Sequence, residues 1–169
     1  MIRLSTLLLI VGMALSACQP AAPPLDSNGE PLPVAYKIGK REAAKIPFRM
    51  LDSVNALRSS SGLGPLVLDA QLTAAAATHS RDMQIQNRPW HFGSDGSSPV
   101  DRVRRVGFTG TLVGEVISET YETELVTLGA WMGQPDTRRV IMSPQANKMG
   151  FSWYQEDNGK IWWMLVLGN

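Results

Sequence analysis

The sequence predicts an α+β domain in which helices cover both faces of a small sheet. In the stretches that follow Pro47 and Asp69, apolar residues recur at spacings of three and four, which is the period of an amphipathic helix. Near the C-terminus, residues 161–167 are apolar at every position. A strand that is apolar on both faces lies at the centre of a sheet, with other layers above and below it.

Length, charge and cysteine content limit the possible functions. The 169 residues carry a formal net charge of +1, and 44% of them are hydrophobic. This is enough chain for one globular domain with a buried core. Because no face can be strongly basic without an acidic excess elsewhere, we expect no nucleic-acid partner. The single cysteine, Cys18, excludes an intramolecular disulfide, so packing must stabilise the fold.

Residues 1–17 resemble the signal peptide of a bacterial lipoprotein. A short positive start precedes an apolar run, residues 7–15, that is too short to span a bilayer comfortably, and small residues stand directly before Cys18. The resemblance implies that Cys18 is lipidated and anchors the exported protein to a membrane. Gln19, rather than Asp, follows the cysteine, which by the same resemblance favours the outer membrane. The alternative is a plain secretory signal with an incidental cysteine.

Residues 18–45 are predicted to form a tether, and residues 46–169 the domain. No helical or alternating period survives in the tether, which is rich in proline and small or polar residues. Tyr36 and Ile38 are large apolar residues near its end, which leaves open a second arrangement in which the last third of the tether packs on the domain. The prolines of the tether are Pro20, Pro23, Pro24, Pro31 and Pro33.

Two amphipathic helices are predicted at the start of the domain. Pro47 suits the first turn of one helix, which ends before Gly62. Asp69 is a good N-cap for a second helix over residues 70–86. We interpret His79, on its inner face, as a core or boundary histidine with one or two hydrogen bonds rather than a ligand. The inner faces are Met50, Leu51, Val54 and Leu57 in the first helix, and Leu72, Ala75, Ala76, His79 and Met83 in the second.

A turn and a short helix are predicted after the second helix. Trp90-His91 leads into Ser94-Asp95-Gly96-Ser97, which is a strong turn signal. Ser98, Pro99 and Asp101 then form a capping-box pattern. The arginines that follow either bind an anion or form a solvated face with one structural ion pair, and we favour the second interpretation. They are Arg102, Arg104 and Arg105.

The last third of the chain combines one more helix with the strongest β signal. Glu115 interrupts the apolar residues 112–117 and needs a partner if it is buried. A third helix is expected after residues 120–123, followed by an arm over residues 134–143. Asn158-Gly159 then predicts a hairpin turn. The third helix is expected to turn Leu125, Leu128, Gly129 and Met132 inward, and the first hairpin strand to bury Met149, Phe151 and Trp153.

The order of these motifs resembles the CAP superfamily, which includes cysteine-rich secretory proteins, antigen 5 and plant pathogenesis-related proteins, in its bacterial SCP-like form. The resemblance covers about residues 48 to 168 and implies a three-layer α-β-α sandwich with a small, mainly antiparallel sheet. It is carried by N-A-L-R-S-S-S-G-L-G-P-L-V-L-D from Asn55, A-A-A-T-H-S-R-D-M from Ala75, H-F-G-S-D-G-S-S-P-V-D-R from His91, G-E-V from Gly114, A-W-M from Ala130 and the terminal hairpin.

The resemblance also implies a cavity with two His and two acidic groups, which in some members holds a divalent metal. His91 matches the first His and Glu115 the first acidic residue, whereas Gln134 and Thr137 stand at the positions of the second acidic residue and the second His. Zinc in proteins takes about four ligands, mostly imidazole or thiolate. His91 and Glu115 supply two ligands, and Gln134 and Thr137 are poor substitutes for the other two. Asp136, one residue before Thr137, is an alternative ligand that we do not favour, so we expect zinc binding no tighter than adventitious.

Three hypotheses about function follow. The preferred one is a non-enzymatic binding module for a lipid, a cell-envelope component or a protein, with a degenerate cavity. A protease-like hydrolase is the first alternative, because a His with a Glu is half of a triad, and Ser94, Ser97 and Thr137 are candidate nucleophiles. The second is a purely structural role, in which His91 and Glu115 pin two loops. The predicted ligand-binding residues are His91, Glu115, Gln134, Thr137 and Trp90, with Tyr121 or Trp153 at the border of the cleft.

Overall fold

The computed structural model describes residues 35–169, which form one compact unit. The predicted signal peptide, Cys18 and the tether up to residue 34 lie outside the described residues. From residue 35 onward no helix is both long enough and apolar enough to cross a membrane. The end of the predicted tether packs on the domain: Tyr36 N–H donates to the Tyr121 carbonyl at 3.1 Å, and Ile38 N–H donates to Gln155 Oε1 at 2.9 Å.

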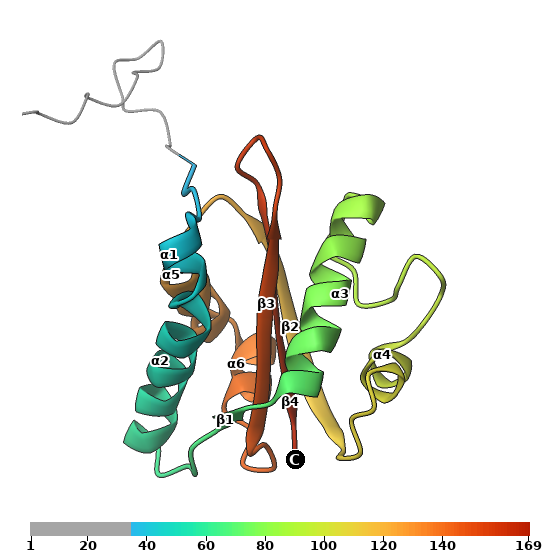
Figure 1. The fold of residues 1–169 in the computed structure, drawn as a ribbon. Coiled ribbons are helices and arrows are strands. Elements are labelled where there is room, and N and C mark those ends of the chain that lie inside the picture. Colours follow the sequence, from blue (N-terminus) through green and yellow to red (C-terminus); the bar gives the residue numbers. More distant parts are fainter. Residues whose placement is uncertain (1–34) are drawn as a thin grey trace, which may run out of the picture. The chain divides into compact units, whose positions relative to one another are not determined.

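The described residues form a three-layer α-β-α sandwich, as the sequence predicts (Figure 1). The strands β3 and β4 lie at the centre of a four-stranded sheet in the order β1-β3-β4-β2; only the β1–β3 pair is parallel. One outer layer contains α1, α2 and α5, and the other contains α3 and α4. In chain order the elements are α1 (Lys40–Ala43), α2 (Ile46–Ser60), β1 (Val67–Leu68), α3 (Ala70–Gln86), α4 (Pro99–Arg105), β2 (Leu112–Thr120), α5 (Glu124–Gly133), α6 (Pro135–Ile141), β3 (Lys148–Gln155) and β4 (Ile161–Gly168).

The strand β4 divides the hydrophobic core in two. All of its residues are buried, and because side chains alternate along a strand, successive residues enter different layers. Trp163 packs with the residues of α2 and α5, whereas Trp162 packs with those of α3 and α4. This confirms the prediction of a central strand that is covered on both sides.

The helix α3 lies very close to β3. Its N-cap is Asp69, as predicted, whose side chain accepts from Leu72 N–H at 2.8 Å. Opposite this first turn stands Gly150, where an added Cβ would lie 2.2 Å from the backbone carbon of Leu72. Only glycine permits this approach, and Ala75 and Ala76 continue the narrow contact as buried residues. Both alanines thus lie on the inner face of the helix, as the sequence predicts.

One local prediction is wrong in part. The helix α5 turns Leu128 inward as predicted, but with it Glu124, Thr127 and Trp131, while Leu125 and Gly129 are exposed. The physical reason is an ion pair: Arg49 lies 2.7 Å from the Glu124 carboxylate and makes its burial possible, which a hydrophobic pattern does not reveal.

The expected arm over residues 134–143 is mostly the helix α6. Ile141 is buried, and Val140 and Met142 are partly buried against the core.

Candidate functional site

Glu115 is the buried centre of the candidate site. It lies on β2 with Arg102 of α4 on one side and His91 on the other. Arg102 Nη2 donates to Oε1 at 3.0 Å and to Oε2 at 2.9 Å, while His91 Nδ1 lies 2.8 Å from Oε1. Since a carboxylate accepts, His91 donates through Nδ1–H, and its Nε2 stays free of this pair. The guanidinium is the partner that the buried carboxylate requires.

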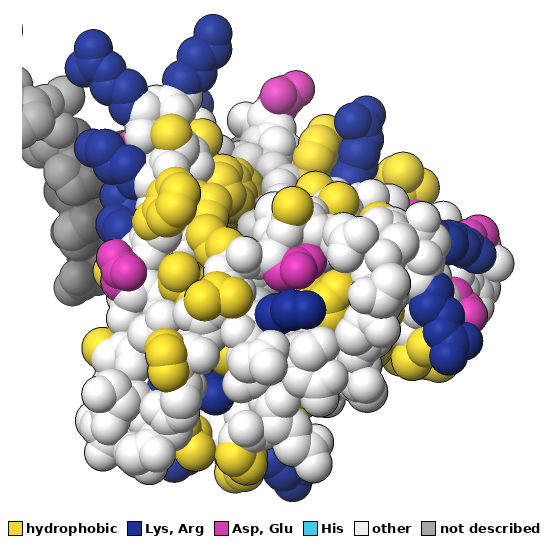
Figure 2. Space-filling model, turned by 60° about the horizontal axis from the view of Figure 1, so that its bottom comes forward, with side chains coloured by type: hydrophobic (Ala, Val, Ile, Leu, Met, Phe, Trp, Pro, Cys, Tyr) yellow, Lys and Arg dark blue, Asp and Glu magenta, His cyan; other side chains and the backbone are white. Residues whose placement is uncertain are grey.

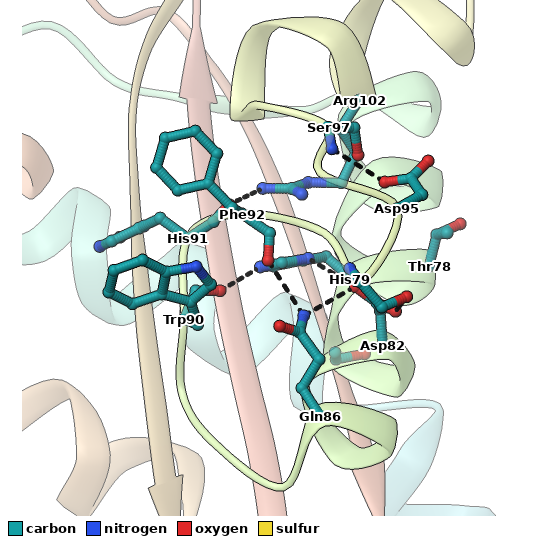
Figure 3. A network of polar contacts seen from close by, with 12 residues as sticks. Thr78, His79, Asp82, Gln86, Trp90, His91, Phe92, Asp95, Ser97 and Arg102 are labelled. Atoms are coloured by element: carbon teal, nitrogen blue, oxygen red, sulfur yellow. Dashed lines mark hydrogen bonds and ion pairs between the residues drawn. The ribbon is translucent and has the colours of Figure 1, made fainter.

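The loop that carries His91 is fixed through three consecutive backbone carbonyls (Figure 3). The Trp90 carbonyl accepts from His79 Nε2 at 2.7 Å. The His91 carbonyl accepts from Arg102 Nη2 at 3.1 Å, and the Phe92 carbonyl accepts from Gln86 Nε2 at 3.0 Å. His79 is buried and makes one hydrogen bond, which confirms its interpretation as a core histidine. The backbone of this loop is therefore held by side chains of α3 and α4.

The side chains of this loop point outward. Trp90 is 43% exposed, Phe92 46%, and the side chain of His91 51%. The rings of Trp90 and Phe92 are tilted by 40° with their centroids 5.9 Å apart, and the guanidinium carbon of Arg88 lies 4.4 Å from the centre of the Trp90 ring. We call Trp90, His91 and Phe92 the imidazole–aromatic patch. It is a fixed surface of three exposed rings.

Gln134 and Thr137 lie at the junction of α5 and α6. Gln134 is the exposed N-cap residue of α6, and its side chain makes no capping bond. The Thr137 hydroxyl donates to the carbonyls of Trp131 and Gln134, so it stabilises the first turn of this helix. In the described part of the chain, no hydrogen bond joins either residue to His91 or Glu115. Asp136 is exposed and pairs with Arg139 at 2.7 Å.

The hydroxyls considered as nucleophiles have other partners. Ser94 Oγ donates to Asp82 Oδ1 at 2.5 Å, and Thr137 belongs to α6 as described. Ser97 lies beside Asp95, whose carboxylate accepts from the Ser97 N–H at 2.9 Å. Among residues 35–169, no hydroxyl is hydrogen-bonded to the imidazole of His91. The geometry thus contains the imidazole–carboxylate half of a triad without its nucleophile.

The residues present do not fit a zinc site. No group of three or more His, Cys, Asp or Glu side chains within residues 35–169 is placed to hold a metal ion. Both oxygens of Glu115 already accept from a guanidinium, and only one imidazole nitrogen of His91 remains. Catalytic zinc sites use three protein ligands and structural ones four. Weak, adventitious zinc binding stays a prediction for titration.

Arg102 is the functional residue that sequence reasoning missed. The sequence predicted a solvated arginine face with one structural ion pair but did not identify the arginine that forms the pair. It is Arg102, which is buried and holds both Glu115 and the His91 carbonyl, while Arg104 and Arg105 are exposed. Arg105 does face solvent and pairs with Asp95 at 2.5 Å. Two observations in the sequence together pointed to Arg102: the capping box that fixes the start of α4, and a buried Glu115 in need of a cation.

Comparison with known proteins gives one family. The family model of the cysteine-rich secretory protein family (CAP) matches residues 51–167. The uncharacterized protein YkwD of Bacillus subtilis is 28% identical over 120 residues, which are 71% of this chain and 46% of that protein. The chain spans a little less than half of the length of this relative.

Solved structures share the fold. An extracellular SCP-domain protein from Bacillus anthracis superimposes with a TM-score of 0.69 at 20% identity, over 79% of this chain and 45% of that one. An outer surface protein from Borrelia burgdorferi has a TM-score of 0.68 at 19% identity, over 80% of this chain and 98% of that one. At this level of identity the likeness shows the fold alone.

Proposed function

Since this chain is a member of the cysteine-rich secretory protein (CAP) family, we propose that it is an exported binding module of the cell envelope. In this proposal the lipidated Cys18 anchors the domain to a membrane, the outer membrane where the cell has one. Solved relatives are described as an extracellular protein and an outer surface protein, which agrees with export. The domain binds its ligand without catalysing a reaction.

The observation that carries the proposal is the anchoring of three consecutive carbonyls beneath the imidazole–aromatic patch. Adjacent exposed aromatic rings are typical of binding surfaces, and fixing the backbone in advance reduces the entropy lost on binding. A structural pin would need Glu115 and the buried face of His91, but it would not need Trp90 and Phe92 in solvent.

An envelope glycan is the ligand that we propose for this patch. Aromatic rings stack on the C–H faces of sugars, and the free Nε2 of His91 exchanges hydrogen bonds with hydroxyl groups. The charge of Arg102 does not help to bind the ligand, because Glu115 already neutralises it, whereas the guanidinium of Arg88 lies on the Trp90 ring. The ligand is therefore recognised mainly by stacking and hydrogen bonds, with the cation of Arg88 beside the patch.

Co-sedimentation with purified peptidoglycan sacculi tests the proposal, with residues 19–169 as the protein. We expect Trp90→Ala and Phe92→Ala each to reduce the bound fraction at least fivefold. Phe48→Ala is the matched control, because Phe48 is also an exposed aromatic residue but lies on α2. Equal sedimentation of wild type and both patch variants would reject the glycan proposal.

Lipid binding is a second candidate, favoured by a groove between α2 and α5. The groove has a volume of about 410 Å³ and is lined almost wholly by apolar side chains. On the face drawn in Figure 2, hydrophobic side chains gather on the left, the side on which α2 and α5 lie in Figure 1. The proposed occupant is a single acyl chain. The lining residues are Ser53, Ala56, Leu57, Leu125, Leu128, Gly129 and Met132.

Native mass spectrometry after incubation with palmitate tests this candidate. A Cβ added at Gly129 meets no atom within 4 Å, so the position accepts a side chain, and Gly129→Leu adds apolar volume to the groove lining and favours the helix. We expect this variant to lose the palmitate adduct. Gly133→Leu is the control, because Gly133 has the same free space but does not line the groove. An adduct that survives in Gly129→Leu contradicts lipid binding here.

A further inference from the structure

A second hollow lies between α3, the turn over residues 93–97 and α4. Its volume is about 320 Å³, and its lining includes Thr78 and His79 from α3, Ser97 from the turn, and Arg102 from α4. Neither Glu115 nor any residue of the imidazole–aromatic patch lines it. The size is at the lower end of the range for small-molecule pockets. We call it the α3–α4 cavity.

The wall of this cavity contains buried polar atoms that lack partners. His79 is 1% exposed and Arg102 5%, yet His79 Nδ1 and Arg102 Nε and Nη1 make no hydrogen bond. Every hydrogen bond of the Arg102 side chain is donated by Nη2, to the Glu115 carboxylate and to the His91 carbonyl. A buried polar group without a hydrogen bond is destabilising, so these atoms favour a polar occupant of the cavity.

The protonation of His79 fixes what this occupant must offer. A backbone carbonyl only accepts, so Nε2 must carry a hydrogen to bind the Trp90 carbonyl. Burial lowers the pKa of His79, and the charge of Arg102 lowers it further, which keeps the ring neutral. Nδ1 is consequently a bare acceptor that needs a donor, whereas Arg102 Nε–H and Nη1–H are donors that need an acceptor. A hydroxyl group satisfies both kinds of need.

The charged groups that line the cavity disfavour an anion, because both of its arginines already have a carboxylate partner. Arg102 is paired with Glu115 at 2.9 Å, and Arg105 with Asp95 at 2.5 Å. Asp82 keeps its negative charge, but its Oδ2 accepts from Ser94 N–H at 2.8 Å and from Gln86 Nε2 at 2.9 Å, and its Oδ1 accepts from Ser94 Oγ. Among the residues that line the cavity no unpaired cation attracts an anion, and the Asp82 oxygens that would attract a cation are already occupied.

We propose that the α3–α4 cavity binds a neutral polyhydroxy compound of the size of one sugar ring. Hydroxyl groups of this ligand donate to His79 Nδ1 and accept from Arg102 Nε–H and Nη1–H. The volume equals that of about ten liquid waters at roughly 30 Å³ each, which is room for such a ring. This site is separate from the imidazole–aromatic patch and does not rest on the function proposed for that patch.

Titration of ¹⁵N-labelled protein (residues 19–169) by NMR tests the cavity, with glucose, N-acetylglucosamine and inositol as probes. We expect saturable shifts of the amides of Thr78, His79 and Ser97 with at least one of these probes, and none with sodium sulfate or acetate. If no polyol gives saturable shifts, or if only the anions do, the proposal is wrong.

Three variants locate the binding. Thr78→Leu places a larger apolar side chain at an exposed position that lines the cavity, and we expect it to weaken binding at least tenfold. His79→Gln keeps a donor for the Trp90 carbonyl but removes the acceptor Nδ1, and should have a similar effect. Ala77→Leu is the control, since Ala77 is exposed on the same helix and lies outside the cavity.

The outcomes also separate this site from the patch. Trp90→Ala should leave the polyol titration unchanged while it reduces sedimentation with sacculi. Thr78→Leu should do the reverse. If Thr78→Leu and Ala77→Leu bind the polyol equally well, the ligand does not occupy the α3–α4 cavity.

Discussion

Two arginines are buried in this domain, and they differ in how fully they are used. Arg58 is 1% exposed, and each of its nitrogens donates to a backbone carbonyl. Nε binds Gly64, Nη1 binds Ile141 and Ser143, and Nη2 binds Ala146, all at 2.9–3.0 Å. Arg102 is equally inaccessible but uses Nη2 alone. Arg58 therefore joins segments of backbone. Arg102 instead binds a carboxylate through Nη2, while its Nε and Nη1 have no hydrogen-bond partner.

Arg58 is a structural residue, whereas Arg102 belongs to the candidate site. Burial without a carboxylate partner lowers the pKa of Arg58, and its four carbonyl bonds offset that cost. Each nitrogen of the Arg58 side chain thus has a partner within the fold. Arg102 contacts three features of the candidate site: Glu115, the His91 carbonyl and the α3–α4 cavity. Incompletely satisfied polar groups on a cavity wall favour the binding of a ligand.

Substitution of each arginine by lysine should give the largest contrast. Arg58→Lys replaces three donor nitrogens by one and leaves carbonyls without partners, so we expect the free energy of unfolding to fall by about 3 kcal/mol. Arg102→Lys loses only nitrogens that make no bond in the protein, and Nζ can replace Nη2. We expect a loss of about 1 kcal/mol. Urea unfolding at pH 7 measures both values.

The order of the two effects is what matters in this experiment. A loss at Arg102→Lys as large as that at Arg58→Lys would mean that the fold needs the whole guanidinium at both positions. The inference that Nε and Nη1 of Arg102 are not needed for folding would then be wrong.

Titration of His79 sharpens the contrast, because His79 faces Arg102 and not Arg58. Its pKa is lowered by burial and by Arg102, so the unfolded chain binds a proton near pH 6.5 that the folded protein rejects. Stability from this group is fully present above pH 6.5 and is lost as the pH falls below it, by at most about 1.4 kcal/mol per pH unit.

Urea unfolding between pH 5 and pH 7.5, together with NMR titration of the imidazole, measures this effect. His79→Gln should flatten the decline below pH 6.5. Arg102→Met should raise the pKa of His79, since it removes a neighbouring cation, whereas Arg58→Lys should leave that pKa unchanged. Equal pKa values of His79 in wild type and Arg102→Met would show that burial alone keeps the ring neutral.

The contact between Arg102 and Glu115 could not be predicted from the sequence, unlike the fold around it. The layers, the central strand, the caps at Asp69 and Ser98, and the core position of His79 all follow from local patterns that act over a few residues. The partner of Glu115 depends on how α4 packs against β2, and a pattern of hydrophobic residues contains no information on such a contact.

The same limit explains the error in α5. Its buried face contains Glu124, which a hydrophobic pattern assigns to solvent, because the compensating Arg49 lies on another helix. The α3–α4 cavity was missed for a related reason. Its wall consists of residues that look like an ordinary helix, turn and helix, and only the three-dimensional arrangement leaves Nδ1 of His79 without a partner.

Arg102, Glu115 and His91 form one hydrogen-bonded cluster, and of the substitutions considered, that of His91 should have the smallest effect on stability. His91→Ala removes one hydrogen bond from Glu115, but Arg102 still neutralises the carboxylate, and half of the imidazole is in solvent. We therefore expect the free energy of unfolding to fall by only about 0.5–1 kcal/mol, measured by urea unfolding. Binding to sacculi should fall much more, at least fivefold. A loss of stability above 2 kcal/mol with unchanged binding would instead make His91 a structural pin, and the comparison with Arg58 would then apply to the whole cluster.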